Sequence, residues 1–566
     1  MMKIMHNVTI YTMDKSFSTG DAIAWEKDKI IEVGKKQDLL EKYKEAKKID
    51  GQGVTLLPGF IDPHIHFLDG LIYQGALDCS PEKAPTIKRL KELLQESASQ
   101  CEKGQWVVAH GYDPWEYPEK QTPSRHDLDD ACPDHPAVII HYSVHECVAN
   151  SRALQLAGID KNTPQPFAGE IKKDRKGNPT GHLIETAIGG VLKQSRESLI
   201  ENTKTGIMQR LVKMQHSLFE FGITRIGDPA VQTKSRALYQ EACDEGLLKI
   251  PVVLYPCNDE NMLELPWDKV NQPQPWEGNE QLMTGPLKIF LDGSDRAAMV
   301  LDAGQFFKTI LMTFLASIQT LSLNPIKTSM RSPVKPGRDL KFHFGLMMAD
   351  TAQCRDLVSK ALDKNYTLAF HAIGNEAIQQ AIEMIAAEGK KHWNDPPPRI
   401  EHCLFLNDEM IRRIKELNIT VVTQPYFLTH MSKENVPHLP GIKQLPLKSF
   451  LDAGVRVSGS SDWPVASCDP LQGIERAVTR VTKNNEILQK CEAISVREAF
   501  AMYTSEAAYA LGLNHDIGSL ESGKRADFIL LSENPFSADK IKWKNLKVTG
   551  TFLGGEKVFS RVPDKI

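Results

Sequence analysis

Two histidines one residue apart follow an apolar run in the segment LLPGFIDPHIHFLDG, residues 56–70. If Val54 to His66 forms a β-strand, the side chains of His64 and His66 point to the same face, because side chains alternate along a strand. Two imidazole nitrogens on one face can bind one divalent cation. A chain with 17 histidines also contains chance pairs, so a metal site requires further ligands elsewhere in the sequence.

Four more residues with metal-binding or acid–base chemistry stand in other apolar runs of β-strand type. They are Lys288 in GPLKIFLDG, His371 in YTLAFHAIG, His402 in PRIEHCLF and Asp462 in VRVSGSSDWPV. Each one alone has a plainer explanation. The histidines could be hydrogen-bonded core residues, Asp462 could cap a helix or form a turn, and Lys288 could pair with Asp292. Taken together, their common placement on strand-like runs favours one shared site.

Apolar runs and helical patterns alternate through the middle of the chain. Eight runs of strand type are followed by helical periodicity, which is typical of a parallel sheet covered by helices. We therefore expect an α/β fold of the (β/α)8 TIM-barrel class, in which catalytic groups lie at the C-terminal ends of different strands. The histidines and Asp462 named above occupy these ends, whereas Lys288 lies near the middle of its run.

The two ends of the chain are β-rich and differ from the middle. Short, turn-bounded runs such as NVTIYTMD near the start and ADFILLSENP near the end predict one small β-sandwich domain built from residues 1–56 and 515–566. Residues 57–514 form the predicted barrel. On the order of 150 residues separate its first two strands, far more than one βα unit needs. An inserted α/β subdomain at about residues 75–195 is therefore expected.

Composition limits the possible partners and location. The net charge of −4 and the absence of a basic block argue against nucleic acid. The ten cysteines form no C-x-x-C pair, and the N-terminus has no signal-peptide pattern, so a cytoplasmic location is expected. The apolar stretch 309–323 is short for a membrane span and predicts a buried helix or an active-site lid, with no membrane partner. Exposed edges of the predicted sheet domain favour a homodimer.

The motifs PGFIDPHIH, HAIGNEA, RIEHCLF, GSSDWPV and the tail DIGSLESGKRADFILLSENP together resemble the metal-dependent amidohydrolase superfamily over nearly the whole chain. The long insertion, with HGYDPWEYP and HECVANSRALQLAGI, is similar to the amidohydrolase branch that contains N-substituted formamide deformylases. The resemblance implies a hydrolase that acts on a carbon–nitrogen bond other than a peptide bond in a small-molecule amide.

The resemblance also implies one or two divalent metal ions per chain, with Zn²⁺ expected from the imidazole and carboxylate ligands. One ion would bind His64, His66 and Asp462, and a second would bind His371 and His402. Lys288, carboxylated by carbon dioxide, would bridge the two ions. A metal-activated hydroxide would attack the substrate carbonyl, and Asp462 would pass the proton to the departing nitrogen.

The chain departs from the family pattern in two places. Roughly forty residues, 303–341, intervene after the fourth strand, where a short connection is usual. Asn375 in HAIGNEA stands where the family commonly has an aspartate, which leaves the predicted ligands intact but could alter the groups that orient them.

Substrate contacts are less determined by the sequence. An amphipathic pocket for an aryl or alkyl amide could be lined by His145, Tyr112, Trp115 and Trp463, although these aromatics could equally hold the insertion to the barrel. A deaminase acting on a nucleobase-like or cyclic amidine substrate would share the barrel and most ligands, and would release ammonia. A non-enzymatic scaffold on the same fold would lack ligands, and no ligand is missing.

Overall fold

The computed structural model describes residues 1–561 except 115, 119, 260, 262, 264–274, 294–295, 321–325, 327–333, 338–339, 390–395, 430, 432–438 and 538–540. Each of the eight runs that the sequence predicts as strands contains a strand in this structure. The strands form two parallel sheets with the orders β15-β14-β13-β6 and β16-β20-β21-β23-β25. Their bounds are β6 (Phe60–Asp62), β13 (Ile223–Val231), β14 (Val252–Pro256), β15 (Leu282–Thr284), β16 (Leu287–Phe290), β20 (Leu368–Ala372), β21 (Arg399–His402), β23 (Thr420–Thr423) and β25 (Val457–Gly459).

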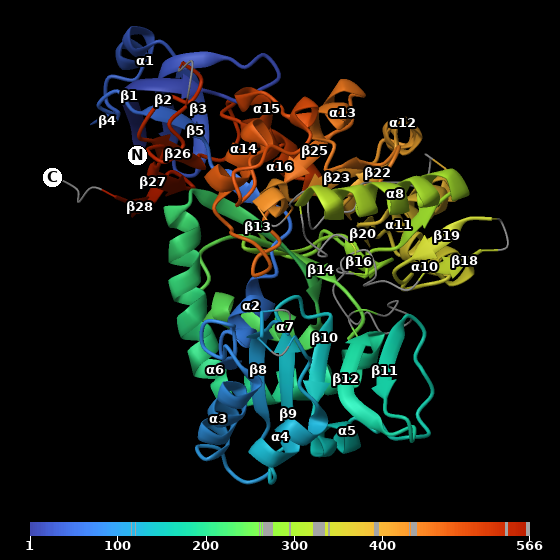
Figure 1. The fold of residues 1–566 in the computed structure, drawn as a ribbon. Coiled ribbons are helices and arrows are strands. Elements are labelled where there is room, and N and C mark those ends of the chain that lie inside the picture. The colour runs from blue at the N-terminus through green and yellow to red at the C-terminus, as the bar shows by residue number, and fades with distance from the viewer. Residues whose placement is uncertain are drawn as a thin grey trace.

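The two parallel sheets meet at both edges. On one side, β15 leads directly into β16, and β14 lies against β16. On the other side, Ser461 N, just after β25, donates to the Asp62 carboxylate at the end of β6 at 3.1 Å. Helices surround these sheets (Figure 1). They include α2 (Phe67–Tyr73), α6 (Gly189–Glu220), α7 (Thr233–Asp244), α10 (Thr351–Asp363), α11 (Asn375–Glu388), α12 (Asp408–Glu416), α13 (Leu447–Asp452), α14 (Pro470–Thr479), α15 (Val496–Met502) and α16 (Ser505–Ala510).

The main hydrophobic core lies between the parallel strands and these helices. Buried strand residues such as Ile226, Leu254 and Phe370 pack there with buried helix residues such as Leu218 and Ile378. The strands are buried on both faces because helices cover one face and the interior covers the other. The α/β class predicted from the sequence is confirmed.

The expected single strand from Val54 to His66 is wrong. The run breaks at Gly59 into β5 (Thr55–Pro58) and β6, which belong to different sheets. Gly59 passes so close to Thr224 that a Cβ atom there would lie 2.3 Å from the Thr224 hydroxyl oxygen. His64 and His66 therefore lie in the loop after β6, directly before α2, and not within a strand.

The two chain ends pair in one sheet, where Figure 1 shows strands of both termini side by side. Hydrogen bonds join all eight strands, because β1 pairs with β4 over its first half and with β5 over its second. The pairing thus connects the strands of both chain ends in one hydrogen-bonded network, and residues of β1, β2, β26 and β27 share one hydrophobic core. The strands are β1 (Met2–Tyr11), β2 (Thr19–Glu26), β3 (Lys29–Gly34), β4 (Lys47–Asp50), β5, β26 (Phe528–Leu531), β27 (Val548–Leu553) and β28 (Glu556–Ser560), and α1 (Lys36–Lys42) lies beside them.

A separate six-stranded sheet is formed between α2 and α6, with the order β11-β12-β10-β9-β8-β7. It has its own core around Leu90, Ile139 and Val148. Its elements are β7 (Leu77–Asp78), α3 (Ile87–Ala98), β8 (Val107–Tyr112), α4 (Arg125–Ala131), β9 (Ala137–His141), β10 (Glu146–Ala149), α5 (Ser151–Leu156), β11 (Gly169–Lys173) and β12 (Pro179–Glu185). The loop before β10 carries His145, whose ring lies 6.3 Å from that of His371 of β20 and whose Nδ1 meets Glu185 at the end of β12.

The described part of the long connection after β16 includes the exposed helix α8 (Ala303–Thr320) and a small sheet of β17 (Met299–Leu301), β18 (Lys335–Pro336) and β19 (Phe342–Phe344). Another short pair is β22 (Phe405–Leu406) with β24 (Lys443–Gln444). The expectation of a buried helix in this stretch is wrong, because Phe307, Leu311 and Phe314 are exposed. Among the described helices none has the length and apolar character to cross a membrane.

Candidate metal centre

His64, His66 and Asp462 come together where β6 and β25 end. The backbone N–H of Asp462 donates to His64 O at 2.8 Å, and that of His66 donates to Trp463 O at 2.8 Å. These bonds hold the two loops together, and the Nε2 atoms of both histidines lie 3.3 Å from Asp462 Oδ1. Among the described residues these three form a group whose ligand atoms all lie within 4.8 Å of one another. The spacing suits one divalent cation.

His371 and His402 lie beside this group on neighbouring strands. β20 and β21 are parallel, and the ring centroids of His371 and His402 are 4.5 Å apart. The His402 ring is 5.0 Å from that of His64. His402 has φ +68°, a left-handed backbone conformation that is uncommon outside glycine. The structure thus brings together all four histidines predicted from the sequence.

Lys288 reaches the same region from β16, whose register places Phe290 beside His371. Its side chain is 1 % exposed, and Nζ has no hydrogen-bond partner among the described residues. No ion pair with Asp292 occurs in the described part of the chain. The Asp292 carboxylate instead accepts backbone N–H bonds from Ala298, Ile373 and Gly374 at 2.8–3.0 Å. The explanation of Lys288 as the partner of Asp292 is therefore not what the structure shows.

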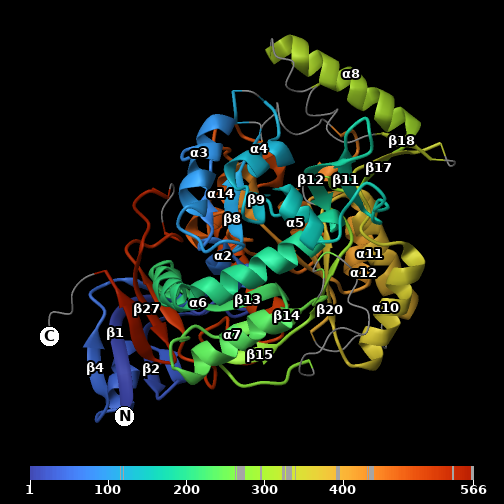
Figure 2. The same cartoon turned by 90° about the horizontal axis from the view of Figure 1, so that it is seen from below.

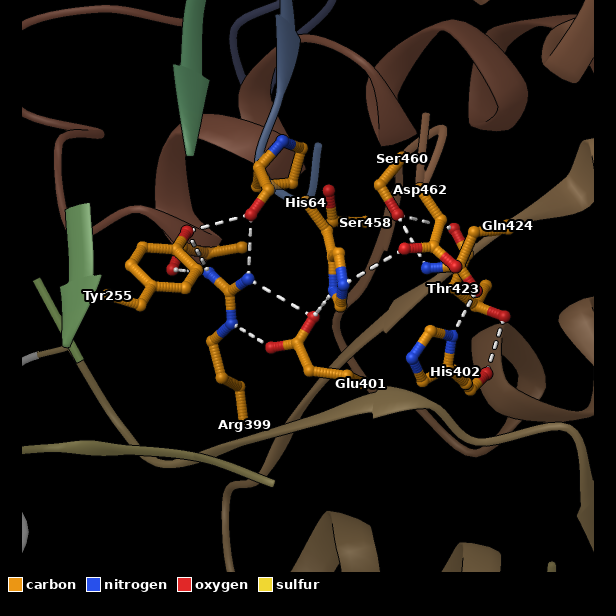
Figure 3. Close-up of polar contacts among 12 residues, drawn as sticks. His64, Tyr255, Arg399, Glu401, His402, Thr423, Gln424, Ser458, Ser460 and Asp462 are labelled. Atoms are coloured by element: carbon orange, nitrogen blue, oxygen red, sulfur yellow. Dashed lines mark hydrogen bonds and ion pairs between the residues drawn. The ribbon is translucent and has the colours of Figure 1, made fainter. Parts of the chain in front are cut away.

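The outer partners of the histidines determine which nitrogen faces the centre. His64 Nδ1 donates to Glu401 Oε2 at 2.5 Å, and Glu401 also binds the buried Arg399 guanidinium (Figure 3). His402 Nδ1 donates to Gln424 Oε1 at 2.8 Å. With Nδ1 protonated and bonded outward, Nε2 of each ring carries the free lone pair, which is the arrangement of metal-binding histidines. The sequence prediction missed Glu401 and Gln424, although RIEH places two buried charges beside a histidine.

Burial and neighbouring charges set the protonation states. Burial lowers the pKa of Lys288 to about 8, that of His402 to about 3, and that of His371 well below its usual range. Burial alone would raise the pKa of Asp462, but its contacts with His64 and His66 hold that pKa well below the usual value. At neutral pH His371 and His402 are therefore neutral imidazoles, Asp462 is a carboxylate and Lys288 is a partly neutral amine, all of which can act as ligands or bases. Contact with Asp462 raises the pKa of His66 despite its burial.

A cavity of about 530 Å³ opens onto these residues. Its polar wall includes His66, Asp69, Asp113, His145, His371, His402 and Asp462. Its apolar wall is formed by Leu263, Phe290, Ile373, Leu404, Phe405, Phe427, Met431 and Val465. Such a mixture of an apolar lining with a few convergent polar groups is typical of a small-molecule site.

The four predicted substrate contacts differ in their placement. His145 lines the cavity, and its Nδ1 lies 2.7 Å from Glu185 Oε2 of β12. Tyr112 does not line it and is buried in the core of the inserted sheet. The Trp463 ring packs against α2, where a Cβ atom on Gly70 would lie 2.2 Å from it, and it also does not line the cavity. Trp115 lies outside the described residues.

Comparison with known proteins identifies the family of this chain. The family model of the amidohydrolase family matches residues 47–559, which is most of the chain. The chain belongs to the amidohydrolase family. Family membership confirms the resemblance seen in the sequence motifs. It also confirms the prediction of a hydrolase that acts on carbon–nitrogen bonds other than peptide bonds.

Two curated relatives of this amidohydrolase are similar over their whole length. The N-substituted formamide deformylase of Arthrobacter pascens is 28% identical over 98% of both chains. The putative amidohydrolase YtcJ of Bacillus subtilis (strain 168) is 28% identical over 99% of this chain and 100% of the relative. A crystal structure of an uncharacterized metal-dependent hydrolase from Pyrococcus horikoshii OT3 shares the fold, with a TM-score of 0.68, 22% identity and coverage of 95% of this chain and 99% of the other.

The asparagine that departs from the family pattern has a structural role of its own in this amidohydrolase. Asn375, at the start of α11, accepts the N–H of Val300 and donates to the Val300 carbonyl, both at 2.8 Å. It therefore fastens β17 to α11 and does not contact the predicted metal ligands in any described interaction. The amide of Asn375 donates and accepts at once, which an ionised aspartate at this position could not do, because a carboxylate has no N–H.

Asn375→Asp is expected to lower the melting temperature by a few degrees, because the Val300 carbonyl loses its donor and meets a carboxylate in a buried place, at a cost of about 1–3 kcal/mol. Asn407→Asp is the matched control. Asn407 caps α12 by accepting from Met410 N, which a carboxylate does equally well. Thermal unfolding of both variants beside the wild type measures the effect. Equal melting temperatures for Asn375→Asp and the wild type would contradict this role.

Proposed function

We propose that this chain is a metal-dependent amidohydrolase that cleaves an amide or formamide-like carbon–nitrogen bond of a small molecule. One observation carries the proposal. Four buried polar atoms at the strand ends have no hydrogen-bond partner among the described residues, and they are His64 Nε2, Lys288 Nζ, His371 Nε2 and Asp462 Oδ1. Leaving such an atom unpaired costs about 1–3 kcal/mol, so a cluster of them indicates a ligand that satisfies them together.

The donor set fits divalent metal ions, and Zn²⁺ in particular. His64, His66 and Asp462 would hold one ion, and His371 and His402 would hold a second, with a carboxylated Lys288 between them. Bound metal supplies Lewis-acid polarisation of a carbonyl and lowers the pKa of a water molecule to near 7. The support for this assignment is the geometry of the three-residue group and the outward bonds that leave each Nε2 free.

The residues themselves perform orientation and proton transfer. Glu401 and Gln424 hold the rings of His64 and His402 in fixed orientations, which keeps their lone pairs directed inward. Asp462 is ionised, borders the cavity and accepts the proton of the attacking water, which it then donates to the departing nitrogen. Phe290, Leu404 and Phe427 exclude bulk water around the reacting carbonyl.

The cavity supports an apolar nitrogen substituent on the substrate. Its apolar wall can bury an aryl or alkyl group, while His145, oriented by Glu185, contacts the amide from the side of the inserted sheet. This combination agrees with the similarity to the N-substituted formamide deformylase. We therefore place secondary amides and formamides with an aryl or alkyl group first among substrates.

The domain arrangement belongs to the same proposal. The two parallel sheets would form a (β/α)8 TIM barrel, supported by the contact of β14 with β16 at one edge and the hydrogen bond between Ser461 and Asp62 at the other. The sheet of the two chain ends would form a second domain. The N-terminal part of this domain would end at Gly59, between the end of β5 and the start of β6. The sheet between residues 77 and 185 would be a subdomain inserted after the first barrel strand.

A screen of N-formyl, N-acyl and cyclic amides with the metal-loaded enzyme tests the proposal. We expect an amine and a carboxylic acid as products, and no turnover by a chelated sample of the same preparation. Pairs of compounds that differ only in the nitrogen substituent, benzyl against hydrogen, report on the apolar wall. Release of ammonia from amidine or nucleobase-like compounds would instead indicate a deaminase. A correctly folded protein that binds no metal would indicate a non-enzymatic scaffold.

A further inference from the structure

Helix α8 presents its apolar side to solvent and its hydroxyl side to the protein. Thr309, Thr313 and Ser317 are buried at 8–9 % exposure. The opposite face is lined by large apolar side chains that are 41–63 % exposed. These are Phe307, Ile310, Leu311, Phe314, Leu315 and Ile318. Surface helices of globular proteins have the reverse arrangement, with the apolar stripe turned inward.

The helix is fastened to the protein in this orientation. Asp302 Oδ1 accepts the N–H of Gln305, and the Gln305 side chain donates to Pro440 O at 3.0 Å. The Phe306 ring stacks on Phe342 of β19 with centroids 3.9 Å apart and planes at 9°. Figure 2 shows that α8 projects from the edge of the molecule. Its apolar face is therefore an outward-facing surface of neighbouring large side chains, and contiguous exposed apolar patches often mark interaction sites.

The segment that carries α8 is basic in sequence. Residues 303–341 contain four lysines and two arginines against one aspartate, although the whole chain carries a net charge of −4. Lys308 on α8, Lys335 of β18 and Lys341 before β19 are exposed among the described residues. The helix itself has no acidic residue between Ala303 and Thr320. An apolar face with basic flanks is complementary to a surface that is apolar below and negatively charged at its boundary.

We propose that α8 and its basic flanks bind the surface of an anionic lipid bilayer. The apolar face would enter the boundary between headgroups and acyl chains, and the lysines would lie among the phosphates. Charge decides against a second copy of this chain on the same face, because self-pairing would bring two basic segments together with no acidic partner on the helix. The proposed membrane binding is independent of the catalytic function and differs from the sequence prediction of no membrane partner, which stays a prediction.

Vesicle co-sedimentation tests the proposal. The protein is mixed with vesicles of phosphatidylcholine alone and with vesicles that contain about one-third phosphatidylglycerol. We expect binding to the anionic vesicles only, weakened by added salt because screening is stronger. Phe307→Ser/Phe314→Ser should raise the lipid concentration for half-binding at least tenfold. Lys308→Glu/Lys335→Glu should also raise the lipid concentration for half-binding to anionic vesicles.

The matched control is Phe167→Ser/Leu156→Ser. These apolar residues lie on the inserted subdomain and are 60 % and 54 % exposed, close to the 63 % and 55 % of Phe307 and Phe314. The control should bind vesicles as the wild type does, and all variants should melt at the wild-type temperature. Equal vesicle binding by Phe307→Ser/Phe314→Ser and by the control Phe167→Ser/Leu156→Ser would overturn the proposal. So would the absence of wild-type binding to anionic vesicles. A dimer in sedimentation that only Phe307→Ser/Phe314→Ser dissociates, without lipid binding, would assign the face to a second copy.

Discussion

Asp462→Asn is expected to lower turnover by about 10² or more while the protein folds and keeps much of its metal. The asparagine has the shape of the aspartate but cannot accept the proton of the attacking water. His64 and His66 remain as ligands, so metal binding is weakened and not abolished. In the structure the Asp462 carboxylate lies 3.3 Å from both Nε2 atoms, where loss of its negative charge affects the reacting centre directly.

The backbone at Asp462 makes asparagine a clean replacement. Asp462 has φ +59°, a left-handed conformation that asparagine and aspartate adopt more readily than other side chains. The turn that follows is closed by Val465 N donating to Asp462 O at 2.9 Å, a bond that does not use the side chain. If Asp462 only formed this turn, Asp462→Asn would be nearly as active as the wild type.

Turnover and bound metal measured on the same preparation decide between these roles. Asp469→Asn is the matched control, because Asp469 lies on the same segment, caps α14 through Leu471 N and does not line the cavity. Asparagine is an equally good cap, so this variant should keep wild-type turnover. Wild-type turnover with full metal in Asp462→Asn would refute the catalytic role. Loss of metal together with activity would make ligation its main role.

Lys288→Ala is expected to lose about one equivalent of metal and to lose more activity than the roughly 10–100-fold typical of an outer ligand partner. The buried amine has a pKa of about 8, so a sizeable neutral fraction exists near neutral pH. That neutral Nζ can attack carbon dioxide, forming an N–C bond and releasing one proton. The resulting carbamate would supply two oxygen ligands where the structure has a buried nitrogen with no hydrogen-bond partner among the described residues.

Two further measurements test the bridging role of Lys288. A short carboxylic acid in the buffer should restore part of the metal and the activity of Lys288→Ala, because it replaces the carbamate oxygens. Lys288→Arg keeps the positive charge but is not carboxylated, since its pKa stays above 12. We expect this variant to be as inactive as Lys288→Ala. An active Lys288→Arg enzyme, or Lys288→Ala with wild-type metal content, would make Lys288 a structural cation.

The positions of the strands could be predicted from the sequence because their signal is local. Buried parallel strands are short apolar runs bounded by turn residues. The runs around Val253 and around Phe370 show this pattern in their own residues, so it can be recognised without knowing which segments pack against them. The exact ends were less predictable. The run that contains Pro58 and Gly59 reads as one strand, and only the approach of Thr224 to Gly59 shows why it divides between two sheets.

The candidate site was predictable where the reactive side chain stands at the end of such a run. Glu401 and His402 show the limit of that reasoning. Neighbouring residues of a strand point to opposite faces, so a sequence argument separates them. In the structure the left-handed backbone of His402 turns its ring toward His371, while Glu401 meets His64 from β6. Contacts between residues 337 positions apart leave no local pattern.

The sequence by itself thus determined the α/β class, the family and the residue types of the candidate centre, because periodicity and reactive side chains are properties of short segments. Tertiary structure alone decided which nitrogen of each histidine faces the centre, that Lys288 lacks an Asp292 partner, and that Tyr112 belongs to a core. It also decided which face of α8 meets solvent. The physical reason is common to all of these: burial and hydrogen-bond partners are set by distant segments, and a helix with apolar and hydroxyl faces has the same sequence whichever face the protein covers.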